Sequence, residues 1–231
     1  LNTKEARQKI LDSLYKLGAK DQLLMYITGP AGAGKSTAID VAQQFCFEFS
    51  RHVNLMWNDR TFYFTALSGC AAALFGGVTL YSAAYLNSKT KNISSDMIDE
   101  WKDVKILIID EISFGTKDQM DTLNDRLNMV KRRLMRETST TPLSPSMVFG
   151  GYHIIWSGDF HQIPPVNVSN DNLLWKNPGL WENAINVAIV LDNSHRFKDD
   201  PQYGELLKRM WRGLCTEEDI DLINESLGKD D

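Results

Sequence analysis

The stretch LLMYITGPAGAGKST, residues 23–37, decides the fold class. Its first six residues are a short apolar run, which indicates a buried strand, and GPAGAGKS at 29–36 fits the pattern G-x-x-x-x-G-K-[ST]. Small residues let backbone N–H groups close around a polyphosphate. The helical pattern from Ser36 to Phe49 would direct the positive end of its dipole at the same anion. The sequence therefore predicts a phosphate-binding loop between a strand and a helix.

This loop implies a nucleotide polyphosphate as ligand and Mg²⁺ as metal. Lys35 would reach the β- and γ-phosphates, and the Ser36 hydroxyl would bind Mg²⁺. A glycine-rich turn of purely structural use is the alternative, and the flanking strand and helix argue against it. The expected nucleotide-binding residues are Gly29, Pro30, Ala31, Gly32, Ala33, Gly34, Lys35, Ser36 and Thr37.

Two carboxylates follow the apolar run VKILIID, residues 104–110. Asp110 ends this run and can hold the hydrated Mg²⁺ beside the loop, while Glu111 is suited to accept a proton from the attacking water. A solvated acidic pair at a strand end is the alternative. We favour catalysis because the pattern of an apolar run, then Asp-Glu, then Ile-Ser is the one that would accompany a phosphate-binding loop in the same chain.

A third motif, GDFHQIPPV at 158–166, follows another apolar run. Gln162 can both donate and accept hydrogen bonds, so near a γ-phosphate it could sense bound and hydrolysed nucleotide. His161 is interpreted as a surface or nucleic-acid-facing side chain rather than a metal ligand.

Strands that alternate with helices predict an α/β domain with a parallel sheet covered by helices on both faces. We expect the strand before Gln162 to lie between the strand before the loop and the strand that ends at Asp110. This order would bring Gln162 to the γ-phosphate. Further strands are expected at 61–65, 104–110, 152–158 and 187–191, and helices at 3–17, 36–49, 117–136 and, as a pair, between 201 and 227. In the 117–136 helix the apolar residues Met120, Leu123, Leu127, Val130 and Leu134 recur at steps of three and four, and a capping box from Thr216 to Asp219 is expected to open the last helix. The inward residues of the 36–49 helix are expected to be Ile39, Ala42, Cys46 and Phe49.

Composition and charge bound the class of protein. The 231 residues carry a net charge of -5, and seven acidic residues with one lysine lie in 216–231, so charge alone neither supports nor excludes a polyanionic partner. Three scattered cysteines predict neither a disulfide framework nor a zinc module, and they favour a reducing intracellular compartment. Residues 61–88 lack charge, but Gly76 and Gly77 break the run, so no membrane span is expected. The basic cluster from Lys131 to Arg136 has two interpretations, a DNA contact or a solvated helix end.

Taken together, these motifs resemble the Pif-one (petite integration frequency) family of DNA helicases, relatives of the RecD type. The resemblance covers almost the whole chain and extends to four further segments, which are TALSGCAAALFGGVTLYS (65–82), WKDVKILIIDEIS (101–113), FGG (149–151) and LDNSHRF (191–197). It implies a RecA-like P-loop fold and an ATP-dependent DNA helicase that moves 5′ to 3′ along single-stranded DNA, with roles in DNA repair and recombination.

The resemblance also implies roles for single residues. Arg196 would reach the γ-phosphate as a fixed cation. Tyr81 could stack on a base, although a core tyrosine is an equal alternative. The DNA-contacting residues that it implies are Thr65, Ser68, Gly69, Tyr81 and Ser82, with His161 as the surface candidate.

The sequence departs from the family pattern at three positions. Glu5 stands where the family has its adenine-reading Gln, Tyr81 replaces a His, and Phe197 replaces a Gln. Gln8, one helical turn after Glu5, is a candidate replacement for the adenine reader.

We expect residues 1–192 to form a first RecA-like domain with a short insert at about 83–100, and 193–231 to carry motif IV toward a second RecA-like domain, since motifs V and VI are not in the sequence. The expected protein is a monomer, located in the nucleus or mitochondrion if its source is eukaryotic. Two alternatives stay open: a nucleotide- or DNA-binding fragment without turnover, and another P-loop phosphotransferase such as a small-molecule kinase.

Overall fold

The computed structural model describes residues 22–52, 54–87, 92–138, 147–192, 197 and 200–227. These residues form a six-stranded sheet in the order β3-β2-β4-β5-β1-β6, and its paired strands are all parallel. The strands are β1 (Leu24–Thr28), β2 (Phe62–Ala66), β3 (Val78–Thr79), β4 (Ile106–Asp110), β5 (His153–Ser157) and β6 (Val187–Val190). The expected parallel α/β fold is confirmed, and β5 lies between β1 and β4 as predicted. The helix expected at 3–17 lies outside the described residues.

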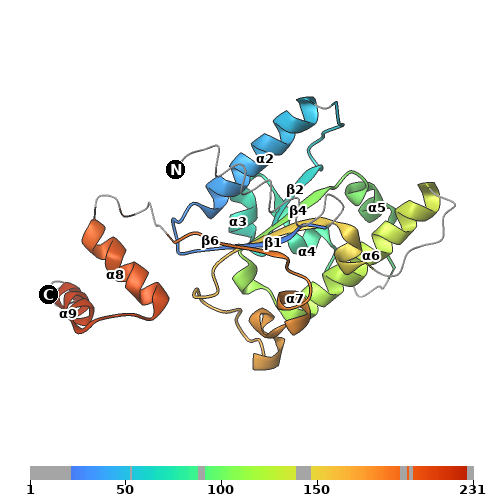
Figure 1. Ribbon diagram of the computed structural model, residues 1–231. Helices are drawn as coiled ribbons and strands as arrows, with labels where there is room; N and C mark the ends of the chain where they lie inside the picture. Colours follow the sequence, from blue (N-terminus) through green and yellow to red (C-terminus); the bar gives the residue numbers. More distant parts are fainter. Residues whose placement is uncertain are drawn as a thin grey trace.

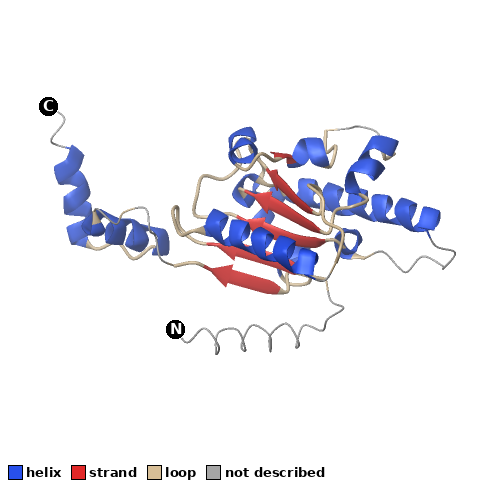
Figure 2. Cartoon of the chain, turned by 90° about the horizontal axis from the view of Figure 1, so that it is seen from above, coloured by secondary structure: helices blue, strands red, loops and turns tan. Residues whose placement is uncertain are grey.

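Helices cover both faces of the sheet (Figures 1 and 2). On one face lies α2, and on the opposite face α4, α5, α6 and α7 pack against a larger core. No helix within the described ranges is long and apolar enough to cross a membrane, and residues 62–83 form two short strands and two short helices. The helices are α2 (Lys35–His52), α3 (Gly69–Leu74), α4 (Leu80–Ala83), α5 (Ser95–Trp101), α6 (Lys117–Thr138), α7 (Pro178–Trp181), α8 (Pro201–Arg212) and α9 (Glu217–Leu227).

The central strand β4 contributes to both cores, because its successive side chains point to opposite faces. Leu107 and Ile109 join the larger core, while Ile108 packs with Ile39 of α2 on the other face. A parallel strand buried on both faces needs apolar residues at nearly every position, which explains the run that ends at Asp110. The predicted stripe of α6 is buried at Met120, Leu123, Leu127 and Val130 and half-buried at Leu134.

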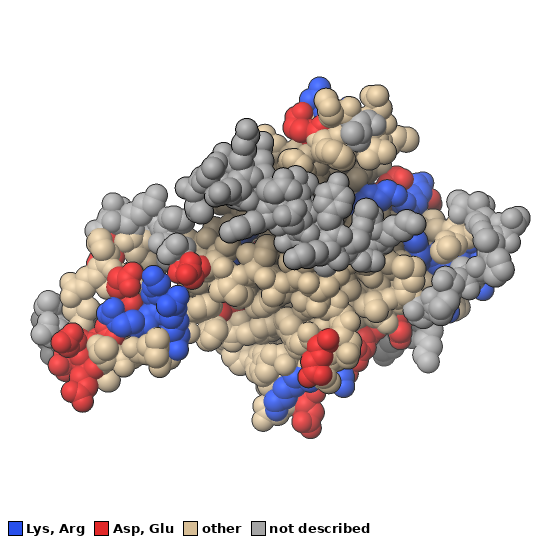
Figure 3. Space-filling view, in the orientation of Figure 1, with Lys and Arg blue, Asp and Glu red and all other residues tan. Residues whose placement is uncertain are grey.

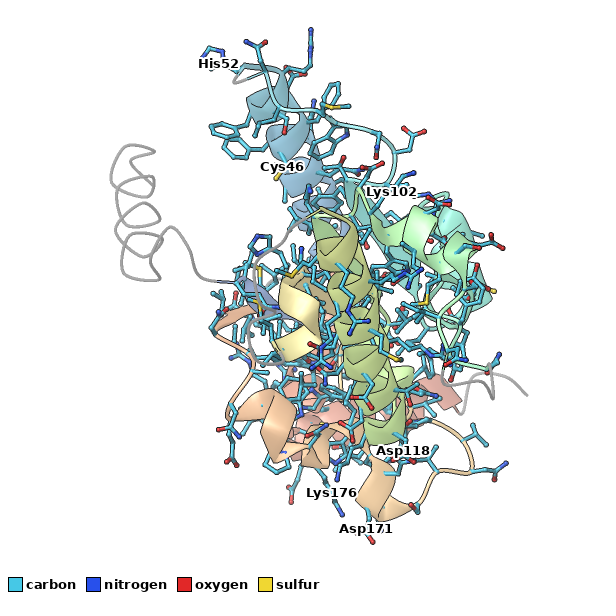
Figure 4. All side chains as sticks on the ribbon, turned by 90° about the vertical axis from the view of Figure 1, so that its right-hand side faces the viewer. Cys46, His52, Lys102, Asp118, Asp171 and Lys176 are labelled. Atoms are coloured by element: carbon cyan, nitrogen blue, oxygen red, sulfur yellow. The ribbon has the colours of Figure 1, made fainter. Side chains whose placement is uncertain are left out.

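The far end of α2 differs from the prediction. Ile39 is buried and Cys46 half-buried, but Phe49 is 52% exposed, so its expected inward position is wrong. An 18-residue helix is about 27 Å long, whereas a five-residue strand spans about 17 Å, so the last turns of α2 extend beyond the sheet. Figure 4 shows Cys46 and His52 on this projecting part.

The segment after β5 is fixed from two sides. Asn172 donates to the Asp118 carboxylate and accepts from the Asp118 backbone N–H, at 2.9 and 3.0 Å, at the start of α6. Asp118 and Asp171 lie at the same end of the molecule (Figure 4). The ring of Phe160 packs against Tyr26 and Trp181, with centroids 5.8 and 5.4 Å apart. These contacts hold the loop that carries the third motif.

The helices α8 and α9 form a charged pair beside the sheet (Figures 1 and 3). Arg209 donates to both carboxylate oxygens of Asp219, at 2.8 and 2.5 Å, and joins the two helices. The predicted capping box is confirmed, since Thr216 accepts from the Asp219 N–H at 3.3 Å and donates its own N–H to the Asp219 carboxylate at 3.0 Å.

Candidate nucleotide site and nucleic-acid interface

The glycine-rich loop turns between β1 and α2 at the carboxyl edge of the sheet. Gly29, Gly32 and Gly34 have φ values of 152°, 78° and 90°, which side-chain-bearing residues rarely adopt. At Gly29 a Cβ atom would lie only 2.2 Å from the carbonyl oxygen of Leu191. The loop can therefore have this shape only with glycine at its first position.

The Lys35 side chain folds back over this loop. Its Nζ donates to the carbonyl oxygens of Gly29 and Pro30, at 2.6 and 3.2 Å. Lys35 is the first residue of α2, Ser36 is half-buried beside it, and Thr37 is exposed. The ammonium, the hydroxyl and the positive end of the helix dipole thus gather at one place, which suits an anion with a bound cation.

The two predicted carboxylates lie at the end of β4. Asp110 is 8% exposed, and Glu111 follows it in the left-handed conformation, with φ 55° and ψ 42°. Burial raises the pKa of Glu111, the charges of Asp110 and Asp159 raise it further, and Lys35 opposes them. A carboxylate with a raised pKa is a stronger base, and non-glycine residues in this backbone region are concentrated at functional sites.

The third motif reaches the same place from β5. Gln162 lines a cavity of about 400 Å³ together with Pro30, Ala31 and Asp159. The chain after β5 passes close to the chain after β4 because Gly158 has no side chain. A Cβ at Gly158 would lie 2.9 Å from the backbone nitrogen of Ile112. The sheet order therefore brings Gln162 to the glycine-rich loop, as the sequence predicts.

Three residues expected to contact DNA lie in β2 or directly after it. Thr65 is fully buried and its hydroxyl donates to the Ile108 carbonyl oxygen at 2.6 Å, so the expected contact of this hydroxyl with phosphate is wrong. Ser68 caps α3 by accepting from the Ala71 N–H at 3.2 Å, and Gly69 is exposed. The available polar groups here are therefore at the start of α3 rather than inside β2.

The other three candidates differ in exposure. Ser82 is exposed, with its Oγ 3.0 Å from Oγ1 of Thr79. Tyr81 is half-buried against the larger core, and its hydroxyl accepts from Nε2 of Gln119, which favours the core interpretation of this ring. His161 is exposed, with Nδ1 3.1 Å from Oδ1 of Asp159.

Three residues with assigned roles, Glu5, Gln8 and Arg196, lie outside the described residues. Their roles in adenine recognition and at the γ-phosphate stay predictions.

Comparison with known proteins decides the family. A family model described as "PIF1-like helicase" matches residues 2–210. The chain belongs to the PIF1-like helicase family. Membership agrees with the resemblance in the motifs.

Individual PIF1-like relatives match most of this chain. The ATP-dependent DNA helicase RRM3 of Saccharomyces cerevisiae is 28% identical over 215 residues, which cover 84% of this chain and 27% of the yeast protein. The ATP-dependent DNA helicase PIF1 of Danio rerio is 31% identical over 204 residues, covering 84% of this chain and 28% of the fish protein. The chain thus spans about a quarter of the length of these curated relatives.

Solved PIF1-like structures share the fold. The crystal structure of Pif1 helicase from Bacteroides in complex with ADP-AlF3 and ssDNA has a TM-score of 0.67 and 22% identity, and the match covers 94% of this chain and 48% of that one. For the Pif1 helicase from Candida albicans the TM-score is 0.60 at 24% identity, with 92% and 44% covered. This likeness confirms the RecA-like P-loop arrangement of the sheet.

Sequence reasoning missed two residues beside this PIF1-like site. Asp159 is 2% exposed, and Trp211 of α8 donates to its carboxylate at 2.9 Å. Asp159 lies two residues after the end of β5, near the same edge of the sheet at which Asp110 ends β4, so its position could have indicated a role. Nothing in the sequence around Trp211 indicates that α8 reaches this loop.

Proposed function

We propose that this chain is the ATP-hydrolysing core of a DNA helicase that moves 5′ to 3′ along single-stranded DNA. The observation that carries the proposal is the convergence of Lys35, Glu111 and Gln162, from three motifs, at the carboxyl edge of one sheet. Residues 1–192 would form a first RecA-like domain with a short insert at about 83–100, and 193–231 would carry motif IV toward a second such domain. The relatives are ATP-dependent DNA helicases, and one similar structure is a complex with ADP-AlF3 and ssDNA, which supports ATP and DNA as ligands.

Each of these side chains has its own proposed role in ATP hydrolysis. Lys35 and the loop amides would bind the phosphates, Glu111 would take the proton of the attacking water, and Gln162 would orient that water. Arg196 would add positive charge at the γ-phosphate.

The donor set also fits Mg²⁺. The Ser36 hydroxyl, at the start of α2, and the Asp110 carboxylate, at the end of β4, are the hard oxygen ligands that this ion prefers. Mg²⁺, when bound, supplies charge that offsets the negative phosphate oxygens.

Single-stranded DNA would contact polar groups that follow β2 and β3. Ser68, Gly69 and Ser82 are the proposed contacts with phosphate, and Tyr81 and His161 are further candidates for contact with DNA. We also propose that the protein acts as a monomer inside the cell, in the nucleus or mitochondrion if its source is eukaryotic.

The test is steady-state ATP hydrolysis with and without a single-stranded oligonucleotide, on this chain and on a longer protein that contains it. We expect DNA to stimulate hydrolysis, Lys35→Ala to abolish nucleotide binding, and Glu111→Gln to keep binding while kcat falls by at least about 10²-fold. Lys176→Ala and Glu182→Gln are matched controls because both side chains are exposed and neither lines the cavity beside Pro30 and Ala31.

The same assay separates the alternatives. Phosphate transfer to an acceptor other than water, without an effect of DNA, would favour a small-molecule kinase. Binding without hydrolysis in both proteins would favour a binding module. Normal turnover by the Glu111→Gln variant would contradict the assignment of the base.

A further inference from the structure

The carboxylate of Asp159 organises the loop that carries Gln162. It is nearly fully buried, and its Oδ1 accepts from the backbone N–H of His161 at 3.0 Å. The backbone N–H of Gln162 donates to the Asp159 carbonyl oxygen at 3.1 Å. The turn that directs Gln162 toward the glycine-rich loop therefore depends on where this carboxylate is held.

The second oxygen of this carboxylate is held by α8. Nε1 of Trp211 donates to Oδ2 of Asp159 at 2.9 Å, across 52 residues of sequence. The indole also packs on His161, with ring centroids 4.7 Å apart. Trp211 thus contacts two of the four residues in the turn 159–162, through a hydrogen bond and through ring packing.

The contact also faces the nucleotide site. Trp211 lines the same cavity as Gln162 and the loop residues Pro30 and Ala31. Asp159 lies close enough to Glu111 for its charge to raise the pKa of that carboxyl. A displacement of the turn would therefore change both the Gln162 side of the site and the position of Trp211.

We propose that Trp211 is a positioning residue that couples the nucleotide site to α8. Its N–H holds Asp159, Asp159 holds the turn that carries Gln162, and a change in this turn on γ-phosphate release is passed to α8. This inference rests on the proposed function, since it requires a nucleotide at the glycine-rich loop. It assigns to α8 a role in hydrolysis that the family motifs do not indicate.

The direct test follows Trp211 in the unmodified chain. The six tryptophans are labelled as 5-fluorotryptophan, and the ¹⁹F resonance of Trp211 is assigned with Trp211→Phe, or by elimination with variants of the other five. Spectra are recorded with Mg²⁺-ADP and with Mg²⁺-ADP plus aluminium fluoride, and nucleotide binding is measured separately by calorimetry. We expect the Trp211 resonance to differ between the two states and this difference to disappear in Gln162→Ala.

A kinetic test complements it. Trp211→Phe keeps a ring on His161 but removes the donor to Asp159, so kcat for ATP should fall about tenfold while KM changes less than about threefold. Trp57→Phe is the matched control. The Trp57 indole packs on Phe47 of α2 and on Phe62 at the amino end of β2, whereas the glycine-rich loop lies at the carboxyl edge of the sheet.

The outcomes distinguish the inference from the proposed function. Nucleotide binding with an unchanged Trp211 resonance, or an unchanged kcat in Trp211→Phe, would overturn the coupling and leave the proposed function in place. Absence of nucleotide binding in the folded, unmodified chain would overturn both.

Discussion

Glu111 directly follows Asp110 at the carboxyl end of β4, and the charge of Asp110 adds to burial in raising the Glu111 pKa. Because the folded-state pKa is above the unfolded one, the ionised Glu111 carboxylate destabilises the fold. This cost is absent below the unfolded pKa, near 4.3, and is fully present once the pH exceeds the folded-state pKa.

Glu111→Gln keeps the shape of the side chain and removes its charge. The variant should therefore unfold at a higher temperature than the unmodified chain at about pH 8, and the gain should vanish at about pH 3.5. Thermal unfolding followed by circular dichroism at both pH values measures it. An equal gain at the two pH values would show that the charge is not its cause.

Gly29 is the most constrained position of the glycine-rich loop. Gly29→Ala would place a Cβ 2.2 Å from the Leu191 carbonyl oxygen, so the free energy of unfolding should fall by at least about 2 kcal/mol and nucleotide binding should be lost. Gly69→Ala is the control for stability, since a Cβ there would meet no atom within 4 Å beyond its chain neighbours and the backbone of its own helix, and it should change stability by less than about 1 kcal/mol. Urea unfolding of both variants decides, and equal losses would refute the steric argument.

Asp219 holds α9 to α8. The Arg209 guanidinium and the Thr216 backbone N–H hold the Asp219 pKa well below its usual range. A lowered folded-state pKa stabilises the fold above the unfolded pKa, near 3.9, and this stabilisation is lost as the pH falls toward the folded-state pKa.

Asp219→Asn should therefore speed hydrogen exchange of the α8 and α9 amides at neutral pH, and the difference in opening free energy should shrink in acid. The neighbouring Glu218→Gln is the control, because Glu218 is exposed. Similar exchange in both variants would mean that the Arg209–Asp219 contact does not hold the pair together.

The family resemblance implies that Thr65 contacts DNA, whereas the structure buries this residue. Thr65→Val should leave the affinity for single-stranded DNA within about twofold, and it should lower stability by about 1 kcal/mol through loss of the bond to Ile108. Ser82→Ala, which removes an exposed hydroxyl, should weaken DNA binding about two- to fivefold. Fluorescence anisotropy with a labelled oligonucleotide gives both affinities, and the reverse order would restore Thr65 to the interface.

The sequence predicts the parts of this fold that depend on local pattern. The loop at 29–36, the helix with Leu123 and Leu127 inward, and the capping box at Thr216 each follow from spacing alone. The position of β5 between β1 and β4 is predicted from the expected role of Gln162, which has to lie near the γ-phosphate.

Features that depend on tertiary packing could not be predicted from the sequence. A strand buried on both faces has no alternation to show that Thr65 points into the core. The exposure of Phe49 depends on how far α2 extends past the sheet. The Trp211 contact with Asp159 joins residues 52 positions apart, and no local pattern predicts it.

The most direct test of the central claim is a crystal structure of this chain with Mg²⁺ and a non-hydrolysable ATP analogue. We predict density for the triphosphate at the amides of residues 29–34, with the Lys35 ammonium moved from the Gly29 carbonyl to the phosphates and Glu111 facing the γ-phosphate. A well-folded chain with an empty loop at saturating nucleotide, or with the nucleotide bound elsewhere, would contradict the account.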